Sequence, residues 1–161
     1  GSASILIEMS KKNCINSFVL GTNGNGHQNL MVPSKDVILK NCKIKKGNLY
    51  MDGSAVFLFT LSTVKKCFME ILKKSKLKKD NIDYIVFHQA SKLVLENLVR
   101  KLDLDKKKVI NNLDNVGNTV SASIPIALKT LINKKKIHKN STILLLGFGV
   151  GYSWGGCIVK C

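Results

Sequence analysis

The chain has 161 residues and a formal net charge of +16, and 45% of its residues are hydrophobic. This length suits one domain with a sizeable core, and no apolar run approaches the roughly 20 residues that a membrane-spanning helix needs. A large positive charge favours acidic partners, but no zinc-finger spacing, recognition-helix pattern or aromatic RNA-binding motif accompanies it. We therefore expect neither a nucleic-acid partner nor a membrane partner.

Five cysteines are scattered along the chain, at positions 14, 42, 67, 157 and 161. No two of them have the CxxC spacing of a zinc or redox site, so we expect no metal ion. Because the sequence shows no secretory signal, we expect these thiols to be reduced, in the cytoplasm. Cys67 falls on an apolar helical stripe, which predicts a small core residue.

The first fifty residues alternate between short apolar runs and polar stretches. Residues 4–8 and 17–20 are predicted as strands, separated from the next element by a Gly/Asn-rich loop over 21–33. Residues 35–49 are expected to be irregular and polar. Because the chain starts without Met, as if inside a strand, we expect it to be a piece of a longer protein.

A helix is predicted next, from apolar residues that recur at three- and four-residue spacing over 56–72. Asp52 or Ser54 would cap its start, and the Lys-rich stretch 73–79 suits its C-terminal end. Residues 82–87 form an apolar run typical of a buried strand. A second helix is predicted to open at His88 and to run through Lys101.

The last third of the chain continues the alternation. A short strand is expected at 109–110, a third helix from 118–121 through Leu131, and strands at 141–146 and 152–159. The Gly-rich turn between the last two strands predicts that they pair antiparallel. Alternating strands and helices indicate the α/β class, with a mixed sheet and layered helices.

His88 follows directly after the predicted buried strand 82–87. In α/β sheets ligand sites gather at the carboxyl ends of strands. A helix N-terminus at this point would disfavour the imidazolium, and a neutral imidazole can donate a hydrogen bond to a carbonyl that becomes negative. A histidine satisfied within the core explains the spacing equally well.

Two further segments also lie at predicted element ends. Asn118 follows a glycine and precedes a run of small residues, so it is either an amide donor to an oxyanion or the cap of a tight turn, and spacing alone favours the cap. Gly149, Val150 and Gly151 would let backbone N–H groups approach a substrate, or form a plain hairpin turn. Neither a dinucleotide fingerprint nor a phosphate-binding loop is present.

The three segments together are more specific than any one of them. HQAS at 88–91, GNTVSASIPIAL at 117–128 and GFGVGYSWGG at 147–156 resemble, in this order, the C-terminal half of 3-oxoacyl-(acyl carrier protein) synthase III. The segment YMDGSAVF at 50–57 resembles the family's segment that opens a helix along the pantetheine tunnel. The chain departs from the pattern at Asn23-Gly24, where the family commonly has Asp-Gly.

The resemblance implies a thiolase-like half-domain over residues 1–161, without the N-terminal half that carries the nucleophilic cysteine. It assigns His88 and Asn118 to the catalytic site, with backbone N–H groups of Gly149, Val150 and Gly151 holding an oxyanion. It implies decarboxylative condensation of acyl-CoA with malonyl-acyl carrier protein in fatty acid biosynthesis. No cofactor is implied beyond these thioester substrates. The full enzyme is implied to be a homodimer of two-half subunits, and none of the five cysteines here inherits the nucleophile role.

Substrate contacts follow from the same matching. Gly53, Phe57, Ala90 and Ser91 are implied contacts of the CoA or carrier-protein pantetheine, although Ser91 stands where the family usually has Asn.

Leu93 stands where the family often has an Arg that meets the carrier protein. Lys92, Arg100 and Lys101 would supply a positive patch instead, or would be ordinary solvated helix charges.

Three alternatives stay open at this stage. One is an acyltransferase of the same fold that does not decarboxylate its substrate. Another is a non-catalytic subunit of a thiolase-fold heterodimer. The third is a nucleic-acid-binding protein, whose affinity would fall steeply with salt.

Overall fold

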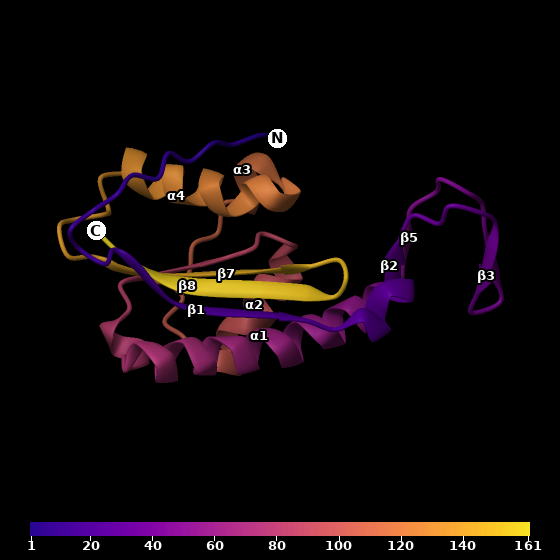
Figure 1. The fold of residues 1–161 in the computed structure, drawn as a ribbon, viewed down its shortest axis with the longest axis horizontal. Helices are drawn as coiled ribbons and strands as arrows, with labels where there is room; N and C mark the ends of the chain where they lie inside the picture. The colour runs from indigo at the N-terminus through magenta and orange to yellow at the C-terminus, as the bar shows by residue number, and fades with distance from the viewer.

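A mixed four-stranded sheet forms the centre of the computed structural model, which describes residues 1–161 (Figure 1). Its strands lie in the order β1 (Ile15–Thr22), β8 (Ser153–Lys160), β7 (Thr142–Gly149) and β6 (Tyr84–Phe87). β6 runs parallel to β7, and the other neighbours are antiparallel. The predicted α/β class and the antiparallel pairing of the last two strands are confirmed.

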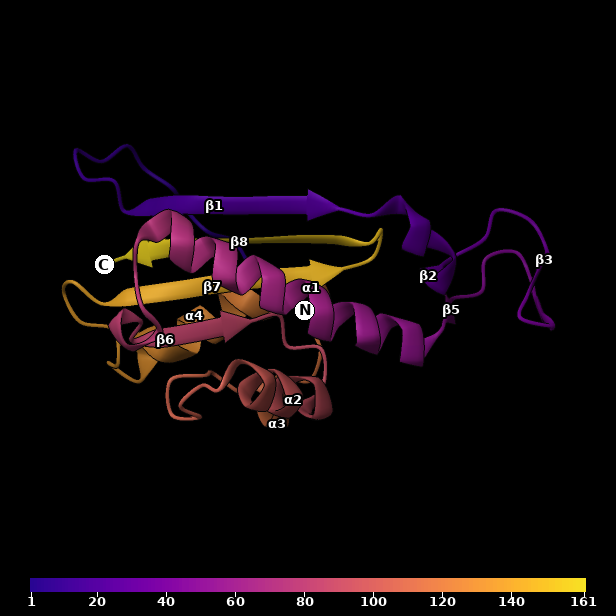
Figure 2. The ribbon, with the colours of Figure 1, turned by 90° about the horizontal axis from the view of Figure 1, so that it is seen from below.

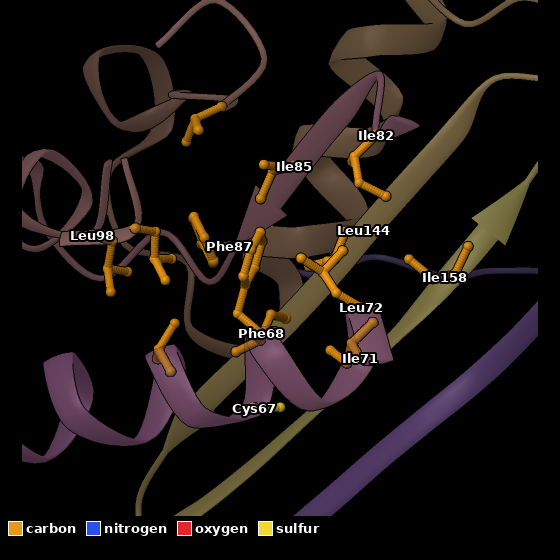
Figure 3. Packing of buried hydrophobic residues seen from close by; sticks show 14 of the residues in the cluster. Cys67, Phe68, Ile71, Leu72, Ile82, Ile85, Phe87, Leu98, Leu144 and Ile158 are labelled. Carbon is orange, nitrogen blue, oxygen red and sulfur yellow. The ribbon is translucent and has the colours of Figure 1, made fainter. Parts of the chain in front are cut away.

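Helix α1 (Gly53–Ser75) covers one face of the sheet (Figure 2). The Asp52 side chain accepts a hydrogen bond of 3.0 Å from the Ala55 N–H, which is the predicted N-cap. Apolar side chains of α1, including Cys67 and Phe68, interlock with Phe87 of β6 and with β7 and β8 in the larger core (Figure 3). The three- and four-residue periodicity therefore identified the buried face of this helix correctly.

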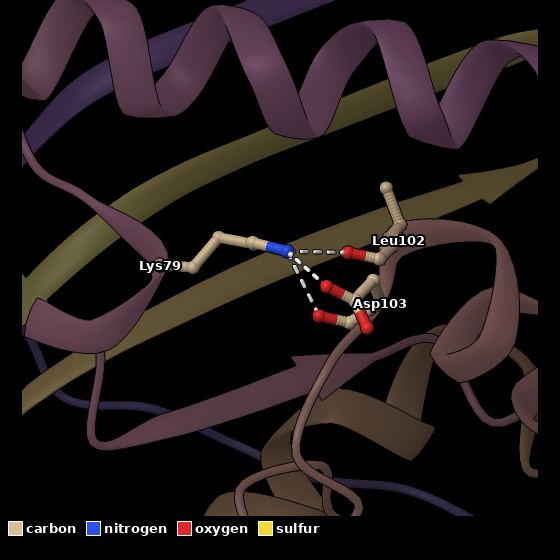
Figure 4. A network of polar contacts seen from close by, with 3 residues as sticks. All are labelled: Lys79, Leu102 and Asp103. Carbon is tan, nitrogen blue, oxygen red and sulfur yellow. Dashed lines mark hydrogen bonds and ion pairs between the residues drawn. The ribbon is translucent and has the colours of Figure 1, made fainter.

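Helix α2 (Lys92–Leu102) packs beside α1 on the same core. Lys79, in the short 3-10 turn η2 (Lys79–Asn81), donates to the carbonyl oxygens of Leu102 and Asp103 at 3.1 and 2.9 Å and to the Asp103 carboxylate (Figure 4). It thereby satisfies acceptors that the helix end leaves free. Ile85 of β6 also forms a parallel bridge with Val109, where the short strand was expected.

The opposite face of the sheet is covered by α4 (Ser123–Asn133), which buries Ala127 and Leu131 against Val86 and Ile143 (Figure 1). Two short elements precede this helix: α3 (Leu113–Val116) and the 3-10 turn η3 (Val120–Ala122). None of the helices combines the length and the apolar composition that crossing a bilayer requires.

A strand-built arm, residues 30–51, projects beyond the end of the sheet (Figure 2). After the 3-10 turn η1 (Gly24–Asn29), strand β2 (Leu30–Met31) pairs with β5 (Tyr50–Met51). Between them β3 (Val37–Leu39) and β4 (Cys42–Ile44) form a hairpin. The prediction that residues 35–49 are irregular is wrong, because Val37–Leu39 pairs with Cys42–Ile44 across the two-residue turn at 40–41.

Three other predicted elements differ in the structure. Residues 4–8 form no strand: they have no neighbouring strand to bond, and Ile5, Leu6 and Ile7 are exposed. The second helix begins at Lys92 rather than at His88, with the Ser91 hydroxyl accepting from the Val94 N–H as its cap. The third helix proper begins at 123, because residues 120–122 form a separate 3-10 turn.

Gly156 in β8 provides a test of how tightly the sheet packs on α1. A Cβ at this position would lie 2.6 Å from the Leu145 carbonyl oxygen and 2.5 Å from Ile71 Cδ1. We expect Gly156→Ala to lower the free energy of unfolding by about 1–3 kcal/mol, because the backbone contact cannot relax by a side-chain rotation. Thermal unfolding measures the change. Gly24→Ala, where a Cβ meets nothing within 4 Å, is the control and should leave Tm unchanged.

Candidate active site

The carboxyl ends of β6 and β7 bring the site together. His88 follows the last residue of β6, while Phe148 and Gly149 close β7. Since β6 and β7 are parallel, both strands deliver these residues to the same edge of the sheet. The His88 backbone N–H continues the ladder to the Leu146 carbonyl at 2.9 Å, so the position of the ring is set by the sheet.

Ser123, the first residue of α4, orients the His88 ring. Its Oγ lies 2.8 Å from His88 Nδ1 and accepts the Gln89 backbone N–H at 3.3 Å. The hydroxyl is buried, so its own proton needs an acceptor, and Nδ1 is the acceptor within reach. His88 Nε2 therefore carries the ring proton in the neutral tautomer.

Burial lowers the pKa of His88 below its ordinary value, and the nearby Val120 backbone opposes this shift only partly. The ring of Phe148 contributes an apolar edge contact, with centroids 5.3 Å apart at 78°. The expected cause was different: a helix N-terminus at His88. That explanation is wrong, because α2 begins four residues later. Desolvation keeps the imidazole neutral instead.

Asn118 is held by two backbone contacts. Its Oδ1 accepts the Val120 N–H at 2.9 Å, and its Nδ2 donates to the Ala90 carbonyl at 3.2 Å. The first contact assigns the oxygen and the nitrogen of the side-chain amide. The second contact uses one of the two Nδ2 protons. The other N–H is left for a ligand. The side chain thus makes the turn contact expected of a cap and still presents a donor.

Gln89 follows His88 directly in the chain, and its side chain is fully buried. Its Nε2 donates to the carbonyls of Phe87 and Ile110 at 2.8 and 3.1 Å, and its Oε1 accepts the Asn112 N–H at 2.8 Å. These three bonds tie the end of β6 to the segment that leads to Asn118. They also hold residues 88–90 out of a helix.

Two connected clefts meet at His88 and Asn118, which line both of them. The first cleft, about 520 Å³, runs between α1 and α2; the second, about 780 Å³, lies along the β7–β8 turn. The walls of the first cleft include Gly53, Phe57, Ala90, Ser91, Leu93, Phe148 and Gly149. The walls of the second include Leu20, Val120, Ser123, Phe148, Gly149, Val150 and Trp154.

The predicted site residues distribute over this geometry unevenly. Gly53, Phe57, Ala90, Ser91 and Gly149 line the first cleft with the two side-chain donors.

Val150 lines only the second cleft, and Gly151 lines neither. Lys92 stands at the N-terminal end of α2, about 12 Å along the axis from Arg100. Lys101 projects about 180° away from Lys92 around the helix. The three cations are thus spread along and around α2, and the predicted patch stays a prediction.

Three residues of the site were missed in the sequence. Ser123 orients His88, Gln89 fixes the loop, and Phe148 desolvates the ring. Gln89 stood in the HQAS motif and Ser123 in the run of small residues after Asn118, but their roles depend on contacts between segments more than twenty residues apart. Only the motif membership was available as a signal.

Comparison with known proteins matches residues 72–161 to the family model described as the C-terminal part of 3-oxoacyl-[acyl-carrier-protein] synthase III. The chain belongs to this family. A family member from Streptococcus pyogenes serotype M3, named beta-ketoacyl-[acyl-carrier-protein] synthase III, is 36% identical over 164 residues, covering 99% of this chain and 51% of that protein. The chain therefore spans about half the length of the curated relatives it matches.

Solved structures of the family have the same fold. A 3-oxoacyl-(acyl-carrier-protein) synthase III crystal structure superposes with a TM-score of 0.86 at 32% identity, over 97% of this chain and 50% of that one. The beta-ketoacyl-[acyl carrier protein] synthase III from Thermus thermophilus gives 0.85 at 30% identity, over 96% and 48%. The predicted family and the thiolase-like half-domain fold are confirmed.

None of the five cysteines lines either cleft. Cys67 lies on the buried face of α1, and burial raises its pKa to about 11. Burial also raises the pKa of Cys157 and Cys161. A thiol must be deprotonated to act as a nucleophile. The site as it stands provides hydrogen-bond donors and walls, but no nucleophile.

The desolvation of His88 is testable by titration. Its imidazole should titrate below the usual value of about 6.5. Phe148→Ala lets water reach the ring, stabilises the imidazolium and moves the pKa up toward that value. NMR chemical shifts of the His88 ring against pH measure both. Phe18→Ala, an exposed ring on β1, is the control; an unchanged His88 titration in Phe148→Ala contradicts the assigned cause.

Proposed function

We propose that this chain is the C-terminal catalytic half of a beta-ketoacyl-acyl carrier protein synthase III, which condenses acyl-CoA with malonyl-acyl carrier protein in fatty acid biosynthesis. The observation that carries the proposal is the meeting of two neutral N–H donors, on His88 and Asn118, where the two clefts join. Such a pair is suited to a carbonyl oxygen that gains negative charge.

The reaction begins on the half that this chain does not contain. A cysteine thiolate of the N-terminal half attacks the acyl-CoA thioester, the C–S bond to CoA breaks, and CoA leaves as its thiolate. Backbone N–H groups of the turn at Gly149, Val150 and Gly151 are proposed to take part in holding the oxyanion. The second cleft, which Val150 lines, provides the space on that side.

Malonyl-carrier protein then enters by the first cleft. Its pantetheine would contact Gly53, Phe57, Ala90 and Ser91, which line this cleft. The thioester carbonyl accepts hydrogen bonds from His88 Nε2 and Asn118 Nδ2. Carbon dioxide leaves, the resulting enolate oxygen stays bound to the two donors, and the enolate carbon attacks the acyl-cysteine and expels the thiolate. The substrates are thioesters, and no cofactor takes part.

The enolate formed by decarboxylation is best stabilised by hydrogen-bond donors that carry no charge. An imidazolium would protonate the enolate oxygen or carbon and divert it from attack, whereas a buried neutral imidazole stabilises the anion without giving up its proton. Each such donor stabilises the transition state by about 3 kcal/mol. An acyltransferase without decarboxylation has no enolate to stabilise, so two fixed donors favour condensation. A non-catalytic subunit has no need of the Ser123–His88 network.

The remaining assignments concern partners. The exposed apolar side chains beside the second cleft, among them Leu20 and Val150, suit the N-terminal half of the same enzyme. We propose a homodimer of such two-half subunits in the cytoplasm. Lys92, at the end of α2 next to Ser91, is the cation of this helix best placed to meet the carrier protein at the mouth of the first cleft.

Replacing either donor tests the proposal in the complete enzyme that contains this chain. His88→Ala and Asn118→Ala should each lower the condensation rate by at least about 100-fold, because one enolate donor is lost, while transfer of the acyl group to the cysteine stays largely intact. Product formation and protein mass after incubation with acyl-CoA separate the two steps.

Matched controls exist on the far side of the molecule. His138 and Asn133 are exposed near the distal end of α4, and His138→Ala and Asn133→Ala should condense at the rate of the unchanged enzyme. Normal condensation by His88→Ala or Asn118→Ala would contradict the proposed roles.

The absence of a nucleophile on this chain gives a second prediction. After incubation with acetyl-CoA and longer acyl-CoA, the intact mass of the chain alone should be unchanged, since no cysteine lies in the clefts. With the N-terminal half present, one acyl group should appear on that half. A stoichiometric adduct on one of the five cysteines here would mean that the chain brings its own nucleophile.

A further inference from the structure

Within the projecting segment 30–51, residues 33–48 form the hairpin arm. The hairpin arm carries a cluster of positive charge near the site. Between Pro33 and Asn48 the sequence has five lysines and one aspartate. All five are exposed. Two of them have acidic neighbours within the chain: Lys40 pairs with Asp52 and Lys43 with Asp36. Three have no ion pair and face solvent, namely Lys35, Lys45 and Lys46.

Hydrogen bonds within the arm hold its two strands together, and one ion pair ties its tip to the start of α1. Within the arm, the Lys46 N–H donates to Asp36 Oδ1 at 2.9 Å and the Gly47 N–H to the Pro33 carbonyl at 3.0 Å. Near the tip, Lys40 reaches back to Asp52, whose other oxygen caps α1. The side-chain hydrogen bond from Lys40 lowers the pKa of Asp52, so the pair stays ionised at neutral pH. The backbone that carries the unpaired lysines is therefore held near the start of α1.

The arm also rises from the wall of the site. Its stem pairs Leu30 of β2 with Met51 of β5, and both residues line both clefts beside His88 and Asn118. A molecule bound to the arm would stand at the mouth of the site. A group attached to that molecule by a flexible chain could then reach the two donors.

We propose that the lysine-rich hairpin arm, residues 33–48, is the docking surface for the acidic carrier protein that delivers the malonyl group. This inference rests on the function proposed above and extends it, because it adds the lysines of the arm to Lys92 of α2 as docking charges. Lys35, Lys45 and Lys46 attract the acidic protein, and the fixed arm orients it over the first cleft.

The side chains of the hairpin arm favour an acidic protein over a nucleic acid or an anionic membrane as its binding partner. Ile38 and Lys43 lie opposite each other on one face of the hairpin, and Ile38 is 75% exposed. Apolar side chains among charges are typical of protein–protein contacts. Single-stranded nucleic acid binds to aromatic side chains that stack on bases, and residues 33–48 contain no Phe, Tyr or Trp. The same lack of Trp and Tyr is unlike a membrane interface.

Helix α2 explains the docking less well. Leu93, 62% exposed, stands at the edge of the first cleft, and the cations of α2 point in different directions. The arm instead gathers its lysines on one short hairpin next to the cleft mouth. Rim charges of this kind act mainly by raising the association rate, so their effect should weaken as salt increases.

The test compares two charge reversals in the complete enzyme. Lys35→Glu/Lys45→Glu/Lys46→Glu changes the arm, and Lys134→Glu/Lys136→Glu/Lys139→Glu makes the same change in net charge at the far end of α4, also at exposed positions. We expect the arm variant to weaken binding of malonyl-carrier protein and to raise its KM by about tenfold or more at low salt. The distal variant should change either value by less than about twofold, since the distance exceeds the range of screened charges.

Three further measurements separate the possible failures. Both variants should retain the acyl transfer from acetyl-CoA and the turnover of malonyl-CoA, which has no protein to dock. Equal effects of the two reversals would overturn the proposal, as would arm-dependent binding of duplex DNA or anionic vesicles without binding of the carrier protein. If the unchanged enzyme binds the carrier protein but never condenses, the proposed function fails while the docking inference stands.

Discussion

The buried amide of Gln89 is the interaction on which the site's geometry depends most. It sits at the end of β6 between His88 and Ala90 and makes three hydrogen bonds to backbone groups of two segments. A buried amide of this kind is costly unless all its groups are paired, and a replacement that leaves any of them unpaired would release the loop. Because residues 88–90 are not helical, His88 lines the clefts and the Ala90 carbonyl meets Asn118.

Electrostatics at the site follow from the same arrangement. Ser123 accepts the Gln89 N–H and donates to His88, which places the imidazole proton on the nitrogen that faces the cleft. Burial, with Phe148 against the ring, keeps that imidazole neutral. Asn118 reaches the same point from a different loop and carries no charge. The result is a pair of uncharged donors suited to the proposed decarboxylative condensation, in which an anion is stabilised without receiving a proton.

Charged and uncharged polar groups lie in different parts of the molecule. The donors lie inside at the junction of two clefts, and the lysines of the arm lie outside at the mouth of the site. The arm is ordered by Asp52, the residue that also caps α1, so one carboxylate connects the external surface to the helix that lines the first cleft. Of the net charge of +16, the hairpin supplies five lysines and one aspartate near the mouth of the site.

Local rules determined much of the fold from the sequence. The periodicity and cap of α1, the apolar run of β6 and the Gly-rich turn between β7 and β8 all appeared as expected, because each depends on neighbouring residues. The three motifs also indicated the family and named His88 and Asn118.

Tertiary structure decided what depends on distant partners. Residues 4–8 have strand-like composition but no strand to pair with, and residues 37–44 form a hairpin despite their polar surroundings. The start of α2, the partner of the His88 ring and the cause of its lowered pKa follow from contacts between β6, residues 110–112 and α4. The sequence by itself determined which residues could perform the chemistry. Only the folded chain decided their tautomer, desolvation and direction, because those properties arise from groups that lie far apart along the chain.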